Sequence, residues 1–181
     1  GQLLARAPTH GRALELASGT GQQVVLFAEA LPGLQWQPSD IDPERLRSIS
    51  AWVAGHGTID APVALDIAQP GWGARMAPRE MIVTVNLLHL ITEAAARTCL
   101  AEAAIALAPG GLLAIYGPFL RDGRATSEGD ARFHAGLRAA GGGIGYKDID
   151  WLTGRLSRHD LTEIEVVSMP VNNLMVFARR A

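Results

Sequence analysis

Short apolar runs alternate along the chain with longer segments in which apolar residues recur every three or four positions. The short runs have the length and composition of buried strands, and the longer segments have the period of helices. This alternation predicts an α/β fold, a doubly wound and mostly parallel sheet with helices on both faces. We expect strands over residues 12–17, 34–37 (reaching 39–40), 62–66, 81–85, 112–116, 163–168 and 173–178.

Turn residues separate these strands from the predicted helices. Asp42 followed by Pro43 is a typical helix start, because Asp caps free N–H groups and Pro fits the first turn. The segment 81–85 is rich in β-branched residues, which favours a central strand, and the last two strands form a closing pair. We expect helices over residues 22–31, 42–54, 92–107, 127–140 and 149–157, with loops at 70–73 and 117–126.

Length and composition narrow the class of protein. A chain of 181 residues, 48% hydrophobic and 19% charged, is predicted to form one globular domain over residues 1–181. A net charge of −2 without a run of five like charges gives no electrostatic reason to expect nucleic acid. The most apolar stretch, 81–91, is too short to span a bilayer, so we expect no membrane partner. The lone Cys99 fits a reducing compartment, and we expect a cytoplasmic location. The oligomeric state stays open.

The loop that follows the first predicted strand carries the strongest chemical signal. Glu15 closes an apolar run, and Ala17, Ser18, Gly19 and Gly21 follow it before the first helix. Glycines at such a turn let backbone N–H groups approach a ligand closely. The loop lacks a third glycine and a lysine, and Glu15 would repel a pyrophosphate. The pattern therefore favours a cationic, nucleoside-bearing cofactor such as S-adenosylmethionine (SAM) over a nicotinamide dinucleotide.

Polar residues also follow the next three predicted strands. Asp40 lies nineteen residues beyond Gly21, where a carboxylate can accept both ribose hydroxyls. Asp66 ends the third strand within reach of an adenine amino group, and Asn86 ends the fourth. The alternative is that the two aspartates only start turns. Because ligands of open α/β sheets bind at the carboxyl ends of strands, we expect these side chains to share one edge.

Several residues are candidates for the acceptor side of such a site. His89 lies three residues beyond Asn86 and is either a general base at the pocket or a core histidine. Trp72, in an expected loop, is a candidate to line the pocket, and the adjacent Asn172 and Asn173 occupy the turn between the last strands. The other histidines show no metal-ligand spacing with the cysteine, so we predict no metal site.

Together these segments resemble the methyltransferase-like family that includes methyltransferase-like protein 26. The resemblance covers essentially the whole chain and rests on residues 15–22, 36–40, 86–89, 116–119, 126–127 and 170–174. Residues 107–112 are similar to the entry of the fifth strand in class I SAM-dependent methyltransferases. The resemblance implies a Rossmann-like, seven-stranded sheet whose last strand is antiparallel. It also implies that the N-terminal helix which usually helps close the cofactor site is absent, so the domain can be truncated there.

Position by position, the resemblance implies which residues contact the cofactor and the acceptor. The SAM contacts would be Glu15, Ala17, Ser18, Gly19, Gly21, Asp40, Asp66, Ile67 and Asn86. Tyr116 would join Trp72, Asn172 and Asn173 on the acceptor side, with His89 as the catalytic residue. The chain departs from the family at Gly129-Asp130, Phe133-His134 and residues 143–148. Because these segments belong to the acceptor side, the resemblance does not indicate which acceptor is methylated.

The sequence therefore predicts a SAM-dependent methyltransferase that acts on a small molecule. Alignment of donor and acceptor is the main task of such an enzyme, because the methyl donor is already activated. The first alternative is a SAM-binding regulatory or structural module without catalysis, favoured by the altered acceptor segment. A nicotinamide-dependent oxidoreductase shares the fold, but Glu15 and the missing third glycine argue against it.

Overall fold

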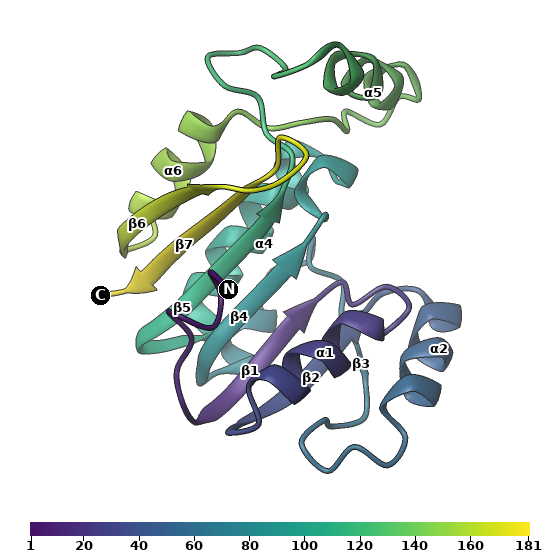
Figure 1. Ribbon diagram of the computed structural model, residues 1–181, viewed down its shortest axis with the longest axis vertical. Coiled ribbons are helices and arrows are strands. Elements are labelled where there is room, and N and C mark those ends of the chain that lie inside the picture. Colours follow the sequence, from purple (N-terminus) through teal and green to yellow (C-terminus); the bar gives the residue numbers. More distant parts are fainter.

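The computed structural model describes residues 1–181, and a twisted sheet of seven strands runs through its centre (Figure 1). The strand order is β3-β2-β1-β4-β5-β7-β6. Strands β1 to β5 are parallel to one another, whereas β7 is antiparallel to both β5 and β6. The predicted doubly wound sheet is confirmed. The strands are β1 (Gly11–Leu16), β2 (Leu34–Asp40), β3 (Val63–Ala64), β4 (Arg79–Val85), β5 (Leu107–Gly117), β6 (Leu161–Ser168) and β7 (Leu174–Arg180).

The helices begin at side chains that satisfy free backbone N–H groups. Asp42, Thr92, Ser127 and Asp148 each accept a hydrogen bond from the first turn of the helix that follows. The five predicted helices are confirmed to within a few residues of their expected ends. The helices are α1 (Gln22–Ala30), α2 (Pro43–Val53), α3 (Trp72–Met76), α4 (Glu93–Ala106), α5 (Glu128–Ala139) and α6 (Ile149–Ser157), with a 3-10 turn, η1 (Leu88–Leu90).

Alternation along the strands builds two hydrophobic layers. In β1, Ala13 faces the layer under α1 and α2, whereas Leu14 faces the layer under α3, α4 and α6. Both side chains are fully buried. Because the strand order reverses between β1 and β4, the loops that follow these strands diverge at the carboxyl edge of the sheet. Ligands of open α/β folds bind at such a point.

Three of the differences from the predicted boundaries affect the arrangement of the site. The third strand shortens to Val63–Ala64, so Asp66 lies two residues beyond the strand rather than at its end. The fifth strand begins at Leu107, which pairs with Arg79, and residues 108–111 form an irregularity before the regular pairing resumes at Leu112 and Met81. The expected loop at 70–73 contains the start of α3, where the left-handed conformation of Gly71 (φ +91°) turns the chain into the helix.

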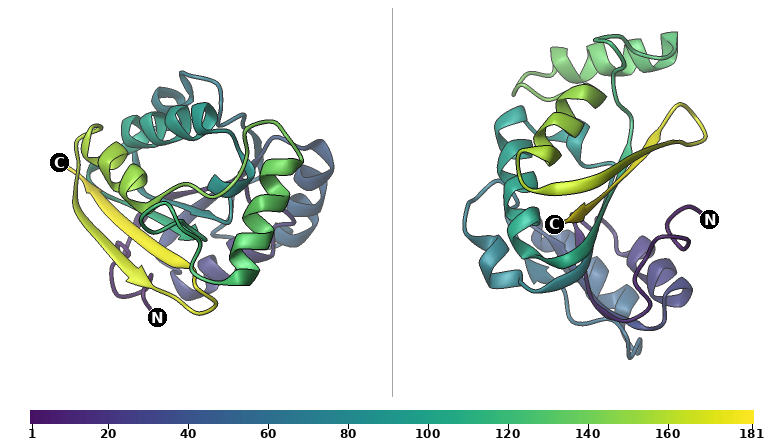
Figure 2. Two further views of the ribbon diagram at one scale, coloured as in Figure 1. Left: turned by 90° about the horizontal axis from the view of Figure 1, so that it is seen from above. Right: turned by 90° about the vertical axis from the view of Figure 1, so that its left-hand side faces the viewer.

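Helix α5 is the least embedded element of the fold. None of its residues is buried, whereas every other α-helix buries at least two. It lies beyond the carboxyl edge of the sheet, apart from the two helical layers (Figures 1 and 2). The helix and the segments on either side of it therefore overhang the edge at which the strands β1 to β5 end.

Candidate cofactor-binding site

The loop after β1 is fixed to the end of β2 by a set of short hydrogen bonds. The Ser18 N–H donates to the Ser39 carbonyl (2.7 Å), and the Ser39 N–H donates to Ser18 Oγ (3.1 Å). Ser39 Oγ donates to the Glu15 carbonyl (2.7 Å). Ala17 adopts a left-handed conformation (φ 54°), which is unfavourable for a residue with a side chain. The surrounding bonds hold that strained backbone at the sheet edge, as is common at functional sites.

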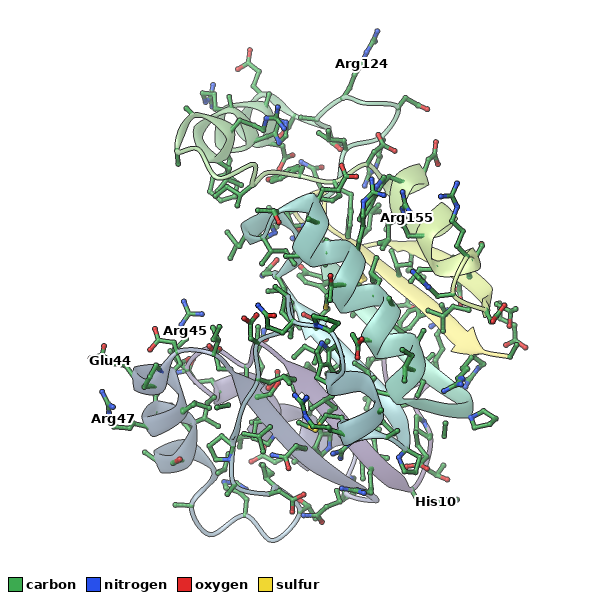
Figure 3. The ribbon with its side chains drawn as sticks, turned by 180° about the vertical axis from the view of Figure 1, so that it is seen from behind. His10, Glu44, Arg45, Arg47, Arg124 and Arg155 are labelled. Carbon is green, nitrogen blue, oxygen red and sulfur yellow. The ribbon has the colours of Figure 1, made fainter.

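Asp40 joins this loop from the end of β2. Its Oδ2 accepts the Gly19 N–H (3.0 Å), and its Oδ1 accepts the Asp42 N–H (3.1 Å). Arg45, which projects from the first turn of α2 (Figure 3), places Nη1 3.8 Å from Oδ2. An ionised carboxylate has about four positions for hydrogen bonds, so two remain for a ligand. Asp40 both orders the glycine loop and presents negative charge beside it.

Glu15 is a buried acid beneath the same loop. Its side chain is 1% exposed, and Oε2 has no hydrogen-bond partner. Burial raises the pKa of this carboxyl to about 7, against the opposing effect of the Ser18 hydroxyl, and the nearby Asp40 raises it further. An unpartnered buried carboxyl is costly, so the fold keeps it at the expense of stability.

A cavity of about 370 Å³, called cavity A here, opens beside Asp40 at this edge. Leu65, Ile67, Leu87 and Ile91 give it apolar walls that suit a planar ring. Asp66 lies at its rim, with Oδ1 accepting the Ala68 N–H (2.9 Å) and the other oxygen without a bond in the chain. The lining residues are Ala17, Asp40, Ile41, Arg45, Leu65, Asp66, Ile67, Ala68, Leu87, Leu90, Ile91 and Ala95.

A second cavity of about 270 Å³, cavity B, lies on the other side of Ala17, which lines both. It is more polar than cavity A and is closed by the end of β4, where Asn86 is left-handed (φ 56°). The strained backbones of Ala17 and Asn86 thus terminate two adjacent strands at one point. The lining residues are Ala17, Ser18, Gly19, Thr20, Gln22, Gln23, Val85 and Asn86.

The two glycines of the loop have different structural roles. A Cβ on Gly19 (φ +60°) would meet no atom within 4 Å and would project into open space beside cavity B. A Cβ on Gly21 (φ +94°) would lie 2.8 Å from Ile49 Cα, and Gly21 lines neither cavity. The structure therefore gives Gly19 the position for close ligand approach, whereas Gly21 permits α1 to pack against α2. The sequence interpretation treated the two glycines alike, and a cofactor contact at Gly21 stays a prediction.

His89 lies in η1, between the cofactor edge and the overhanging helix. Its side chain is 7% exposed and packs edge-on against Phe133 and Tyr146, with ring centroids 6.0 and 5.9 Å away. Burial lowers the pKa of His89 to about 4, and the positive charge of Lys147 lowers it further. The imidazole is therefore neutral near pH 7 and has a free lone pair. His89 lines neither cavity A nor cavity B, so general base and core histidine both stay hypotheses.

The predicted acceptor residues Tyr116, Asn172 and Asn173 come together at the start of β7. Asn173 Nδ2 donates to the Tyr116 hydroxyl (3.0 Å), and Asn172 Nδ2 donates to Asp130 Oδ2 (3.0 Å). Asp130, in the first turn of α5, also accepts from the Tyr146 hydroxyl (3.2 Å) and from Ser127 Oγ (2.7 Å). The pKa of Asp130 is lowered, chiefly by the Ser127 hydrogen bond. This network attaches α5 to the rest of the molecule.

Trp72 does not belong to the site. Its side chain is fully buried in the core, and its indole N–H donates to the Ile67 carbonyl (3.4 Å). The neighbouring Gly73 N–H donates to the buried Glu102 carboxylate of α4 (2.6 Å), which pins α3 against that helix. The prediction that Trp72 lines the acceptor pocket was therefore wrong, because a short helix replaces the expected loop.

Several residues of this edge were missed by sequence reasoning. Ile41, Leu87 and Leu90 line cavity A, and the only signal for them was their nearness to Asp40 and His89. Asp130 had a clearer signal, because Ser127 and Asp130 have the spacing of a helix-capping pair. Tyr146 is sixteen residues from Asp130, and only the tertiary fold brings the two together.

The fold is that of class I methyltransferases of known structure. An O-methyltransferase family protein from Burkholderia thailandensis aligns over 99% of this chain at 19% identity and a TM-score of 0.83. Human N-acetylserotonin methyltransferase, solved with SAM, aligns over 99% of this chain at 15% identity and a TM-score of 0.79. An O-methyltransferase family 2 protein from Planctomyces limnophilus, solved with apigenin, aligns over 94% of this chain at 18% identity and a TM-score of 0.78. The chain spans about half of each of these structures, 52%, 50% and 51% respectively.

A family model narrows the assignment further. The family described as "Protein of unknown function (DUF938)" matches residues 2–180, and the chain belongs to it. Two more properties bear on function. No helix is long and apolar enough to cross a bilayer, and no group of three or more His, Cys, Asp or Glu side chains is arranged to hold a metal ion.

Proposed function

We propose that this chain is a SAM-dependent methyltransferase domain, formed by residues 1–181, that acts on a small molecule. The observation that carries the proposal is the pair of cavities A and B, which share Ala17, with Asp40 and Asp66 among the residues that line cavity A. Cavity A offers apolar walls with Asp40 and Asp66 at its rim, which fits an adenosine group. Cavity B offers backbone N–H groups and Asn86, which fits an amino-acid group. SAM carries both groups.

Charge supports a cationic cofactor. Glu15, Asp40 and Asp66 lie at this edge, and Arg45 is the one basic residue that lines cavity A. Since the Oε2 atom of Glu15 is unpartnered, a positive ligand nearby would offset part of the burial cost. A pyrophosphate would increase that cost. The residues present therefore fit SAM better than a nicotinamide dinucleotide.

The chain's own residues would orient the reaction and exclude water. SAM supplies an activated methyl group on a sulfonium, so the protein mainly has to align the acceptor with it. In this proposal His89 is the general base, because its neutral imidazole can take a proton from an acceptor hydroxyl or nitrogen. Tyr116, Asn172 and Asn173 are placed to bind the acceptor. A thiolate acceptor is already deprotonated and would need little base catalysis from His89.

Three finer assignments belong to the same proposal. The resemblance to the methyltransferase-like protein 26 type rests on the sequence motifs alone. A cytoplasmic location rests on the single thiol, Cys99, which is buried in α4. A small-molecule acceptor is supported by neighbours such as the Planctomyces protein, which was solved with apigenin.

The alternative is a SAM-binding module without catalysis. One observation favours it: α5, which would cover an acceptor, buries none of its own residues. Calorimetry with SAM, followed by assays of labelled methyl transfer to a panel of hydroxyl, amine and thiol acceptors, separates the two. Binding with turnover supports the enzyme, and binding without turnover on any acceptor supports the module.

The most direct first experiment is a thermal-shift comparison. SAM and NADH are added to separate samples, and ligand carried through purification is identified by mass spectrometry. Stabilisation by SAM alone supports the proposed cofactor, because only a ligand of the folded state raises the melting temperature. Stabilisation by NADH alone would contradict it.

A further inference from the structure

A third cavity, cavity C, lies away from the cofactor edge, with a volume of about 170 Å³. It is formed by the start of α4, the end of α5 and the segment that leads into α6, and it shares no residue with cavities A and B. Figure 2 shows the chain crossing the top of the molecule from α5 to α6 at this place. The residues that matter for its chemistry are Glu93, Arg138, Gly143, Ile144, Lys147 and Trp151.

Lys147 is the unusual member of this group. Its side chain is only 7% exposed, and its ammonium group donates to the carbonyls of Ile91 and Gly145. It forms no ion pair with any carboxylate of the chain. An ammonium has three N–H donors, so one donor is left without a partner. Burial lowers the pKa of Lys147 to about 8, although the negative charge of Glu93 opposes that shift from beyond ion-pair distance. A buried cation without a counter-charge is unfavourable unless something else supplies negative charge.

Other donors converge on the same cavity. Arg138 lines it and, like Lys147, forms no ion pair. Gly143 and Ile144 also line it, and their N–H groups donate to no acceptor within the protein. Gly143 has a positive φ (+70°), a conformation that exposes the backbone of this glycine-rich turn. Two cationic side chains and free backbone N–H groups around a small space are the elements of an anion site.

The carboxylates near cavity C are already paired. Glu93 accepts from the Trp151 indole N–H (3.1 Å) and forms an ion pair with Arg97. Asp148 accepts the Asp150 N–H at Oδ1 (2.9 Å) and the Gly123 N–H at Oδ2 (2.7 Å). Neither is within ion-pair distance of Lys147 or Arg138. The two cationic groups are therefore the ones left available to a ligand.

We propose that cavity C binds a small oxyanion, a phosphate or carboxylate group, at a site separate from the cofactor. The volume suits one such group rather than a nucleotide. Cavity C also adjoins the proposed catalytic residue, because the Gly145 N–H donates to the His89 carbonyl (3.0 Å). A bound anion would offset the charge of Lys147, which acts on the His89 ring. The proposal stands whether or not the chain binds SAM.

The test is a titration followed by the amide signals of Gly143 and Ile144 in two-dimensional NMR spectra. Inorganic phosphate and acetate are added in separate series at constant ionic strength and pH 7, to distinguish the two kinds of oxyanion. The expected result is a saturable shift confined to residues around cavity C, from one series or both. The absence of a saturable shift in both series would overturn the proposal.

Matched variants locate the site. Lys147→Met should weaken anion binding by about tenfold or more, and Arg138→Gln by about threefold or more. Arg132→Gln is the control, because Arg132 is on the same helix but pairs with Glu128 and does not line cavity C. The anion affinity of Arg132→Gln should equal that of the wild type. Equal anion affinity in all variants that fold would contradict the assignment, and Arg138, being exposed, can be replaced without loss of the fold.

Discussion

The two halves of the carboxyl edge are built in different ways. On the cofactor half, the loop after β1 is held by backbone and serine hydrogen bonds to the adjacent strand β2. On the acceptor half, α5 is attached through a few side chains, chiefly Asp130, Phe133 and His134. The cofactor half is part of the packed sheet, whereas the acceptor half is joined to the sheet only through side-chain contacts. A fold of this kind can keep one cofactor site while the acceptor segment changes.

The largest effect is expected from Gly19→Val, which tests the cofactor half. A β-branched side chain would project beside cavity B and would be strained at φ +60°, so SAM binding should be lost. Gly123→Val is the matched control, since Gly123 (φ +71°) also has open space around its Cβ but lines neither cofactor cavity. Calorimetry should show binding in the control and none in Gly19→Val. Normal SAM binding by a folded Gly19→Val protein would refute the loop assignment.

The next largest effect is expected from His89→Gln, at the boundary of the two halves. As a general base, His89 should contribute on the order of 10²–10⁴-fold to turnover, with little change in SAM affinity or melting temperature. If His89 is a core residue, the substitution should instead lower the free energy of unfolding by about 1–3 kcal/mol and leave turnover per folded molecule normal. Single-turnover rates and melting curves on the same samples distinguish the two results.

His134→Gln is the control for this experiment. His134 Nδ1 accepts the Tyr146 N–H (3.0 Å) in the same aromatic cluster, so its loss tests packing without the proposed base. A destabilised but fully active His89→Gln protein would exclude the catalytic role.

The features that the sequence predicted lie mostly on the cofactor half. Ser18, Gly19, Asp40 and Asn86 follow strand ends, and local spacing is enough to bring them to one edge. The left-handed backbone conformation of Ala17 could not be predicted from the sequence, because the surrounding structure imposes that strain.

On the acceptor half, prediction needed contacts between distant residues. Trp72 was misplaced because packing of α3 against α4 decides its burial. The partners of Asp130 lie 16 and 42 positions away in the sequence, and no local pattern indicates them. Lys147 was missed for the same reason, since its acceptors include a carbonyl 56 positions away.

A pH-dependent effect of about 3 kcal/mol is expected from Glu15→Gln. The folded chain holds the pKa of Glu15 near 7, above its ordinary 4.5, chiefly by burial. The folded form therefore binds more protons than the unfolded form between these pH values, and the fold loses stability as pH rises through them. Glu15→Gln should stabilise the ligand-free protein at pH 8 and have little effect at pH 4.5.

Denaturant unfolding at the two pH values checks this prediction. Glu29→Gln, on α1, is the control, because Glu29 is exposed. The titration of His89 is common to both proteins and cancels in the difference. An equal effect of Glu15→Gln at both pH values would show that burial of charge is not what destabilises the wild type.

A smaller effect, about tenfold on the apparent affinity for the acceptor, is expected from Asp130→Ala. The change removes the hydrogen bonds from Tyr146, Asn172 and Ser127 that attach α5. SAM affinity should stay constant, because Asp130 lines neither cavity A nor cavity B. Glu128→Ala, two residues earlier in the same first turn of α5, should change neither quantity. A parallel loss of SAM affinity in Asp130→Ala would show that the two halves are not separable.

The measurement that tests the central claim most directly is calorimetry of SAM binding to the wild type and to Asp40→Ala. Charge-assisted hydrogen bonds to a ribose are worth about 1.5–3 kcal/mol each, so the variant should bind at least about tenfold more weakly. Asp42→Ala, which removes the cap of α2 but no cofactor contact, should bind normally. One-site binding by the wild type and the expected loss in Asp40→Ala would support the cofactor half as described. Unchanged affinity in a folded Asp40→Ala protein would contradict it.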